Sequence, residues 1–251
     1  MSVLPDYSGQ AERYDRTRAA SPSVLDPLRA ALGGTPGGTL LDVGGGTGNY
    51  AVPMRADGWD VVVVDRSAAM LARAAAKNLT AVRGDALHLP FAGGAVAAAM
   101  LVAMLHHCGD PQRALSEAMR VVRPGGRVAV MAWAREDIAE SWTASYWPSS
   151  RAWMIPTHPP LADLLAWLPG ATRTEVRWTD LCDGTLAALE SHPELVLDPA
   201  WRLQTSFFER MHRDHPAELE SGLARLAADV AAGTPPRRQG RASMLAWVKP
   251  L

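Results

Sequence analysis

The sequence feature that most constrains the fold is the run VVVVD at residues 61–65. An unbroken stretch of β-branched residues is typical of a parallel strand covered on both faces, because a strand with one solvated face would alternate apolar and polar residues. Other short apolar runs recur between residues 40 and 134, and segments of helical character separate them. This alternation predicts an α/β fold with a doubly wound, mostly parallel sheet that carries helices on both faces.

Capping residues and glycines indicate approximately where the helices and strands begin and end. Ser21 is expected to cap the first helix, and Gly33-Gly34 to end it. We expect helices at 21–32, 49–56, 67–78, 111–122 and 160–168, and strands at 39–43, 61–65, 80–84, 95–102, 127–134, 172–181 and 243–250. Residues 135–160 show no clean period, and residues 185–230 look mostly helical with one interruption. The whole chain, 1–251, is predicted to be a single domain with a seven-stranded sheet.

The glycine-rich segment LLDVGGGTGNY at 40–50 follows the first expected strand. The dinucleotide fingerprint GxGxxG fits it only in a late register that starts at Gly46, with Ala51 as an allowed small residue in place of the third glycine. The alternative pattern, an acid followed by alternating glycines, matches Asp42, Gly44, Gly46 and Gly48 at every position. Glycines at this spacing let a ligand approach the backbone where a Cβ would obstruct it.

One further motif precedes the glycine loop and four follow it. The first is AERYDRTR near the N-terminus, and the others are Asp65 at the end of the valine run, GDALHLPF with Asp85, MLVAMLHHCGDP and RVVRPGGRVAVMAW. Together with the glycine motif, they resemble the class I S-adenosylmethionine (SAM)-dependent methyltransferases of the small-molecule, ubiquinone-biosynthesis-like type. The resemblance covers residues 10–134 and the last strand. It implies a Rossmann-like methyltransferase fold with a helical lid inserted after strands five and six, at about 135–170 and 185–235.

The resemblance also implies how SAM is bound and that S-adenosylhomocysteine is the product. In this family Asp65 takes the ribose hydroxyls, Asp85 accepts from the adenine amino group, and the Ala86 N–H meets the ring. Asp42 orients the glycine loop near the methionine amino group. The complete set expected to bind the cofactor is Tyr14, Arg18, Asp42, Gly44, Gly46, Gly48, Asp65, Arg66, Asp85, Ala86 and Leu101.

The acceptor side is predicted from residue chemistry. A neutral imidazole near the methyl donor can take a proton from a nucleophile, which makes His107 and its neighbour His106 candidate general bases. An aromatic group with one further histidine is expected to wall the acceptor pocket, and its aromatic members can at the same time pack the helices that cap the sheet: Trp133, Trp142, Tyr146, Trp147, Trp153 and His158. The acceptor is thus expected to be a small, apolar or aromatic molecule.

Composition limits the alternatives. The net charge is −1, so no overall positive field attracts nucleic acid or an anionic membrane. The two cysteines lack a CxxC partner, no motif suggests a metal, and no apolar run reaches the roughly 20 residues of a membrane span. A cytoplasmic enzyme is the default expectation. Three other functions stay open: a SAM-binding protein without methyl transfer, an NAD-dependent oxidoreductase, and a methyltransferase acting on macromolecules.

Overall fold

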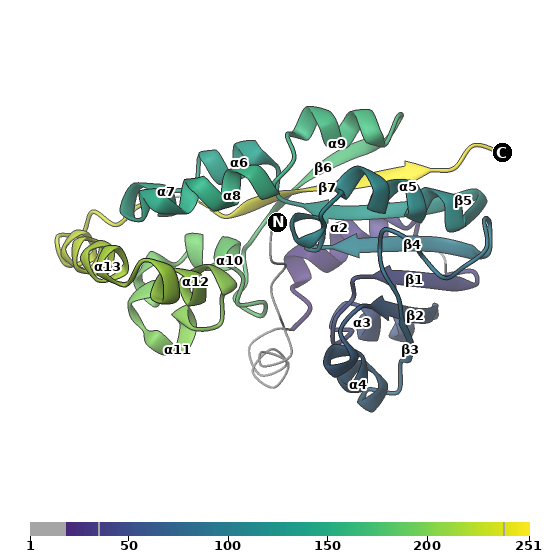
Figure 1. The fold of residues 1–251 in the computed structure, drawn as a ribbon, viewed down its shortest axis with the longest axis horizontal. Helices are drawn as coiled ribbons and strands as arrows, with labels where there is room; N and C mark the ends of the chain where they lie inside the picture. The colour runs from purple at the N-terminus through teal and green to yellow at the C-terminus, as the bar shows by residue number, and fades with distance from the viewer. Residues whose placement is uncertain (1–18, 35, 238) are drawn as a thin grey trace.

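The computed structural model describes residues 19–34, 36–237 and 239–251, which form a seven-stranded sheet flanked by helices (Figure 1). The strands lie side by side in the order β3-β2-β1-β4-β5-β7-β6. Their bounds are β1 (Thr39–Val43), β2 (Asp60–Asp65), β3 (Thr80–Arg83), β4 (Val96–Val102), β5 (Val122–Ala132), β6 (Thr172–Arg177) and β7 (Arg241–Val248). The predicted α/β class and seven strands are therefore confirmed.

The strand order reverses direction at the central strands of the sheet. β1 pairs in parallel with β2 on one side and with β4 on the other, and β7 runs antiparallel between β5 and β6. The chain moves outward from β1 to β3 and then crosses back to β4, so β1 and β4 form a topological switch point. Ligands of open α/β sheets bind outside the carboxyl ends of strands at such a point.

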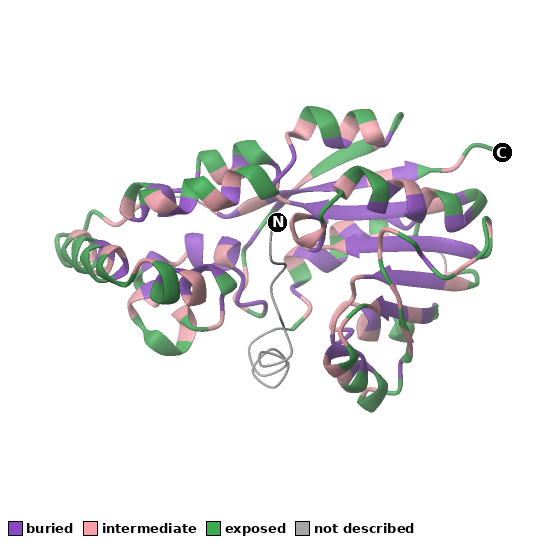
Figure 2. Cartoon of the chain, in the orientation of Figure 1, coloured by how far each residue is buried: buried purple, intermediate pink, exposed green. Residues whose placement is uncertain are grey.

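Two apolar layers explain why the strand sequences do not alternate. Leu40, Val61 and Met100 belong to the core under α2 (Pro22–Ala31), α3 (Ala51–Ala56) and α4 (Ala68–Ala76). On the opposite face, Leu41, Val64 and Leu101 pack under α5 (Pro111–Val121) and α9 (Leu161–Trp167). Successive side chains of a strand point to opposite faces, so both must be apolar when both faces are covered. Figure 2 shows the central strands buried along their length.

A separate group of helices, which we call the lid, lies beyond the carboxyl ends of β1, β2 and β4 (Figure 1). Its helices are α6 (Arg135–Ala139), α7 (Thr143–Tyr146), α8 (Arg151–Thr157), α10 (Leu186–Glu190), α11 (Pro199–Arg202), α12 (Ser206–Asp214) and α13 (Pro216–Ala231), with single turns η2 (Pro148–Ser150) and η3 (Pro193–Leu197). They enclose their own apolar core, which includes Trp147, Phe208 and Leu226.

The structure corrects four local predictions. The predicted lid at 135–170 includes α9, but α9 packs on the sheet beside α5. Ser21 does not cap α2, because its Oγ donates instead to Asp180 Oδ2 at 2.8 Å. β5 begins five residues earlier than expected because Val122 already pairs with Val96 of β4. β6 ends at Arg177 rather than at residue 181.

Candidate active site

The glycine loop lies between β1 and α3 in a backbone conformation that favours glycine. The φ angles of Gly44, Gly46 and Gly48 are +68°, +57° and +76°. The Gly44 N–H donates to the Val64 carbonyl at 2.7 Å, which ties the loop to the end of β2. A Cβ on Gly48 would meet Leu79 Cδ1 at 2.3 Å, whereas a Cβ on Gly46 would meet no atom of the described residues within 4 Å. Gly48 thus serves packing, and Gly46 borders room for a ligand.

Asp65 fixes the glycine loop from the next strand. Its Oδ2 accepts the Gly46 N–H at 3.0 Å, and its Oδ1 accepts the Ser67 N–H at 2.8 Å. An ionised carboxylate has about four acceptor sites, so both oxygens keep capacity for ribose hydroxyls after these bonds form. The sequence indicated the ligand contact at this position, but not that the same carboxylate also holds the loop.

Asp42 lies beneath the loop, at the end of β1, and is only 2% exposed. Its Oδ2 has no hydrogen-bond partner among the described residues. Burial, and secondarily the nearby Asp65, raises the pKa of Asp42 to about 7. A buried acceptor left without a partner is costly unless a ligand or water satisfies it, and a cationic ligand group would also favour the charged form.

Asp85 stands at the third strand end, in the loop after β3. Its side chain is exposed, and its Oδ1 accepts the Leu87 N–H at 2.9 Å. Ala86 is half-buried next to it, and Arg66 is exposed after β2. Leu101 is fully buried within the sheet core, so its side chain packs inside the sheet that supports the site and does not line the site itself. Tyr14 and Arg18 lie outside the described residues.

These residues fit the cofactor predicted from the sequence. Open space beside Gly46, an unpartnered carboxylate oxygen at Asp42, and carboxylates at the next two strand ends suit a ligand that carries a cationic amino acid, a ribose and a base. These groups are mainly acidic, so they do not form a binding site for a negatively charged phosphate. An acidic site of this kind favours the cationic SAM over a dinucleotide with its pyrophosphate.

Aromatic rings gather on the acceptor side, after β4. The turn η1 (Leu105–His107) presents His106, whose ring stacks on that of His158 with centroids 5.0 Å apart and planes 9° apart. Trp133 approaches His106 edge-on at 5.5 Å and stacks on Trp178 at 5.9 Å. His107 lies beside His106, with a centroid separation of 3.8 Å. Four segments distant in sequence thus meet in one ring cluster.

His158 is held in one tautomer. Its Nδ1 lies 2.7 Å from the Met154 carbonyl oxygen, which can only accept, so Nδ1 carries the proton. Burial lowers the pKa of His158, which favours the neutral ring with a lone pair on Nε2. This is the protonation state that a base requires.

The other predicted aromatic residues take a different place. Trp142, Tyr146, Trp147 and Trp153 pack around the lid core with Phe207. The Trp147 Nε1 donates to the Leu219 carbonyl at 3.3 Å, and the ring is fully buried. These four therefore contribute to the lid core, one of the two roles that the sequence predicted for them, and their part in an acceptor pocket stays a prediction. Sequence reasoning missed Trp178, because nothing marks one tryptophan after β6 as a neighbour of Trp133.

Comparison with known proteins identifies the family. Residues 41–130 match the profile of a family described as methyltransferase domain. The demethylmenaquinone methyltransferase of Mycolicibacterium paratuberculosis is 33% identical over 219 residues, which are 76% of this chain and 93% of that protein. The chain belongs to the class I S-adenosylmethionine-dependent methyltransferases. The methyltransferase acts on a small molecule, and the NAD-dependent oxidoreductase alternative is thereby set aside.

Solved structures share the fold of the methyltransferase. A putative methyltransferase from an antibiotic biosynthesis pathway of Anabaena variabilis has a TM-score of 0.78 at 20% identity, covering 92% of this chain and 98% of that one. The [4+2]-cyclase SpnF has a TM-score of 0.58 at 22% identity, covering 91% and 81%. At this identity the similarity shows the fold alone, and the cyclase illustrates that the fold also supports other chemistry.

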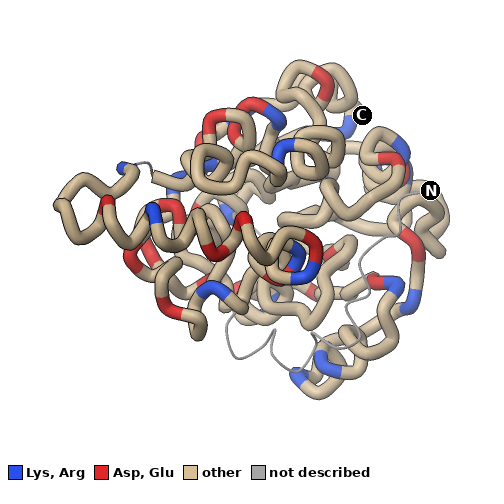
Figure 3. The backbone as a smooth tube through the Cα atoms, turned by 60° about the vertical axis from the view of Figure 1, so that its left-hand side comes forward, with Lys and Arg blue, Asp and Glu red and all other residues tan. Residues whose placement is uncertain are grey.

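Other features bear on the predicted partners. In the part of the methyltransferase that the structure describes, basic and acidic residues are interspersed (Figure 3) and no three His, Cys, Asp or Glu residues are grouped to hold a metal. None of the described helices combines the length and apolarity needed to cross a membrane. Cys108 and Cys182 are both free thiols, and burial raises the pKa of Cys108 to about 11.

Proposed function

We propose that this methyltransferase transfers the methyl group of SAM to a small aromatic ring that carries a hydroxyl, of the quinol type, in the cytoplasm. The observation that carries this proposal is the cluster of Trp133, His106 and His158 beyond β4, which combines flat apolar faces with a proton acceptor. The name of the similar Mycolicibacterium paratuberculosis enzyme, demethylmenaquinone methyltransferase, supports an acceptor of this class.

The binding residues keep the roles predicted from the sequence. Asp65 would hold the ribose, Asp85 and the Ala86 N–H the adenine, and Asp42 the methionine amino group. With these contacts, the methyl group would lie near the carboxyl end of β4, where the ring cluster is found. SAM supplies an activated methyl group on a sulfonium, so the protein contributes mainly positioning and exclusion of water.

The imidazole pair supplies the proton acceptor. His158 Nε2 would take the proton of the ring hydroxyl, which raises electron density on the ring for attack on the methyl carbon. The bond between sulfur and the methyl group then breaks to release S-adenosylhomocysteine, and the ring carbon loses its own proton to solvent as the aromatic ring is restored. Stacking on His106 and the bond to Met154 keep the imidazole in place without further ordering. His107, the base suggested first by the sequence, is the rival assignment, because it lies next to His106.

A turnover assay tests the function. The chain is incubated with SAM and a set of acceptors, namely a reduced demethylated naphthoquinone, a simple phenol and an aliphatic amine, and S-adenosylhomocysteine is quantified. We expect product with the quinol and none with the amine. Binding of S-adenosylhomocysteine without turnover of any hydroxylated ring would show instead the non-methylating role that the sequence left open.

Two histidine variants separate the candidate bases. His158→Gln should lower kcat with the quinol by about 100-fold, the usual contribution of general base catalysis. The loss should shrink as pH rises toward about 10, where a phenolic hydroxyl ionises by itself. His107→Gln should leave the pH profile unchanged. A pH-dependent loss in the His107 variant instead would transfer the role to that residue.

A further inference from the structure

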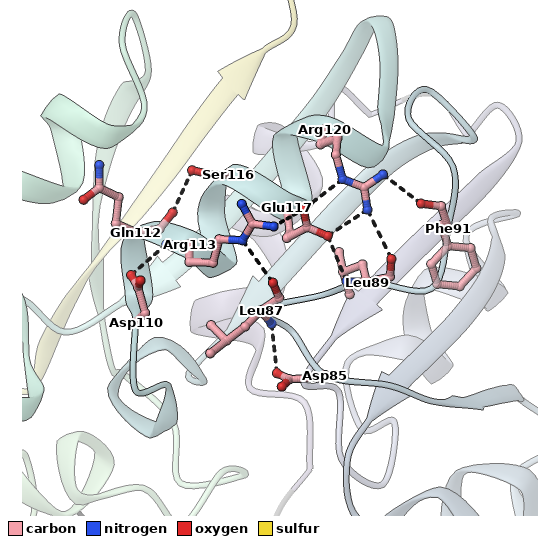
Figure 4. Close-up of polar contacts among 10 residues, drawn as sticks. All are labelled: Asp85, Leu87, Leu89, Phe91, Asp110, Gln112, Arg113, Ser116, Glu117 and Arg120. Carbon is pink, nitrogen blue, oxygen red and sulfur yellow. Dashed lines mark hydrogen bonds and ion pairs between the residues drawn. The ribbon is translucent and has the colours of Figure 1, made fainter. Parts of the chain in front are cut away.

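The loop that carries Asp85 is attached to a helix that takes no part in the site. Residues 85–92 follow β3 and run along α5 (Figure 4). Apart from a single bridge between Asp85 and His88, the loop has no strand partner within residues 19–34, 36–237 and 239–251. Its backbone polar groups therefore need other partners, because unpaired groups at a half-buried position are costly.

Three side chains of α5 supply those partners. Arg113 Nε donates to the Leu87 carbonyl at 3.1 Å, and Arg120 donates to the carbonyls of Leu89 and Phe91 at 3.1 and 2.8 Å. The Leu89 N–H donates to Glu117 Oε2 at 2.9 Å. Four backbone groups of one loop are thus bound by Arg113, Glu117 and Arg120, which we call the α5 clamp.

The clamp is itself preorganised. Glu117 is 5% exposed at its side chain and accepts two bonds from Arg120, at 2.8 and 2.7 Å, while Arg113 lies 3.3 Å away. The bonds from Arg120 hold the pKa of Glu117 down at about 2, against the effect of burial. Only the Glu117 side chain of this ion pair is buried, because those of Arg113 and Arg120 are 48% and 40% exposed. Ion pairs with a partly exposed member add little net stability, so the value of this one is more in geometry than in energy.

One residue connects the clamp to the site. Leu87 accepts from Arg113 through its carbonyl, and through its N–H it donates to Asp85 Oδ1 at 2.9 Å. The two ends of this residue therefore link the guanidinium to the carboxylate. Ala86, the other predicted adenine contact, lies between Asp85 and Leu87 in the same turn. Displacement of Leu87 would move both adenine contacts.

We infer that Arg113, Glu117 and Arg120 are positioning residues that set the adenine selectivity of the methyltransferase by fixing the Asp85 loop. The inference rests on the proposed contact of Asp85 with the adenine amino group. A rigid acceptor favours a base with an amino donor and rejects one with a carbonyl oxygen in its place. A loosened loop can turn the carboxylate away, so it rejects the second base less strongly.

The test compares two ligands by calorimetry: S-adenosylhomocysteine and S-inosylhomocysteine, in which oxygen replaces the adenine amino group. The wild-type chain should prefer the adenosyl ligand by about 100-fold, because an unmatched polar group is costly in a built site. In Arg113→Met this ratio should fall to about 10-fold, with a raised KM for SAM and little change in kcat. Gln112→Ala is the control, since Gln112 is the exposed neighbour on α5 and only its backbone takes part in the contacts of Figure 4.

The outcomes separate the clamp from the function on which it rests. A wild-type chain that binds both ligands equally would contradict the Asp85–adenine contact itself. A wild-type preference that Arg113→Met retains in full would overturn the clamp alone. Glu117→Gln should lower the ratio further, and Arg113→Met covers the case in which that buried substitution prevents folding, because the Arg113 side chain is 48% exposed. A general loss of stability would weaken both ligands alike and leave their ratio unchanged.

Discussion

At the scale of single residues, Asp42 illustrates a binding-site residue that lowers the stability of the folded protein. The fold keeps a carboxyl group almost without solvent contact and leaves one of its oxygens without a hydrogen-bond partner among the residues that the structure describes. A Cβ on Gly45 would meet that oxygen at 2.3 Å, so the loop rests directly on the carboxyl group. Such an arrangement costs stability and persists where a ligand uses it.

Asp42→Asn should therefore stabilise the free protein at alkaline pH and weaken binding. The pKa of Asp42 is raised to about 7, so its contribution to stability is present below the unfolded pKa near 4 and is lost as pH rises toward 7. As pH rises from 5 to 8, the free energy of unfolding of the variant should increase relative to that of the wild type by on the order of 1–3 kcal/mol. Urea unfolding at both pH values measures this change.

Ligand titration provides the second half of the Asp42 test. SAM should bind at least about 10-fold more weakly to the variant, because the cationic amino group loses a charged partner. Equal pH dependence of stability in the two proteins would contradict the buried, protonated state of Asp42. Equal affinity for SAM would contradict its contact with the amino group.

At the scale of elements, α5 joins three parts of the molecule. Leu115, Ala118 and Val121 are fully buried on the sheet, while the clamp on another side holds the Asp85 loop. Lys249, just after β7, donates from Nζ to the carbonyls of Met119, Arg120 and Val122 at 3.0, 3.2 and 2.7 Å. A cation at this end satisfies carbonyls that have no partner within the helix and also suits the helix dipole.

Removing this cation should loosen the carboxyl end of α5. Lys249→Met is expected to lower the free energy of unfolding by about 1–2 kcal/mol, since hydrogen bonds to a charged group are lost together with the dipole interaction. Arg151→Met is a control, because Arg151 is exposed and no hydrogen bond from its side chain is found in the described part of the chain. If the two variants unfold at the same urea concentration, the proposed stabilisation of α5 by Lys249 is wrong.

At the scale of the whole molecule, apolar packing separates the sheet with its flanking helices from the lid. The sheet and its flanking helices, which we call the cofactor half, enclose one apolar core on each face of the sheet. The lid encloses a third core around Trp147. Trp147 packs so closely on α13 that a Cβ at Gly222 would meet its Nε1 at 2.2 Å. A lid with a core of its own can accommodate different acceptors without disturbing the cofactor half.

Trp147→Ala tests this division. Truncation of a fully buried tryptophan should cost about 3–5 kcal/mol of stability. We expect KM for the acceptor to rise by about 10-fold, while the affinity for S-adenosylhomocysteine stays within about twofold because its contacts lie on the sheet. A comparable loss of both affinities would show that the lid also shapes the cofactor site. Calorimetry below the melting temperature of the variant keeps the comparison valid.

Much of the cofactor half was readable because its signals are local. A β-branched run, a glycine turn and an acid at a strand end each specify their own conformation, and parallel strands bring such ends to one edge. The fold class and the family predicted on this basis are confirmed. The roles of Asp65, Asp85 and the other site residues remain predictions that the variants above examine.

The sequence by itself thus determined the sheet, the glycine loop and the kind of cofactor. The tertiary structure alone decided which of the aromatic residues gather around His106 and which fill the lid core. It also brought His158 against His106 and placed three α5 side chains on the Asp85 loop. The physical reason is range: backbone preference acts over a few neighbouring residues, whereas these contacts join segments whose meeting depends on how whole helices pack.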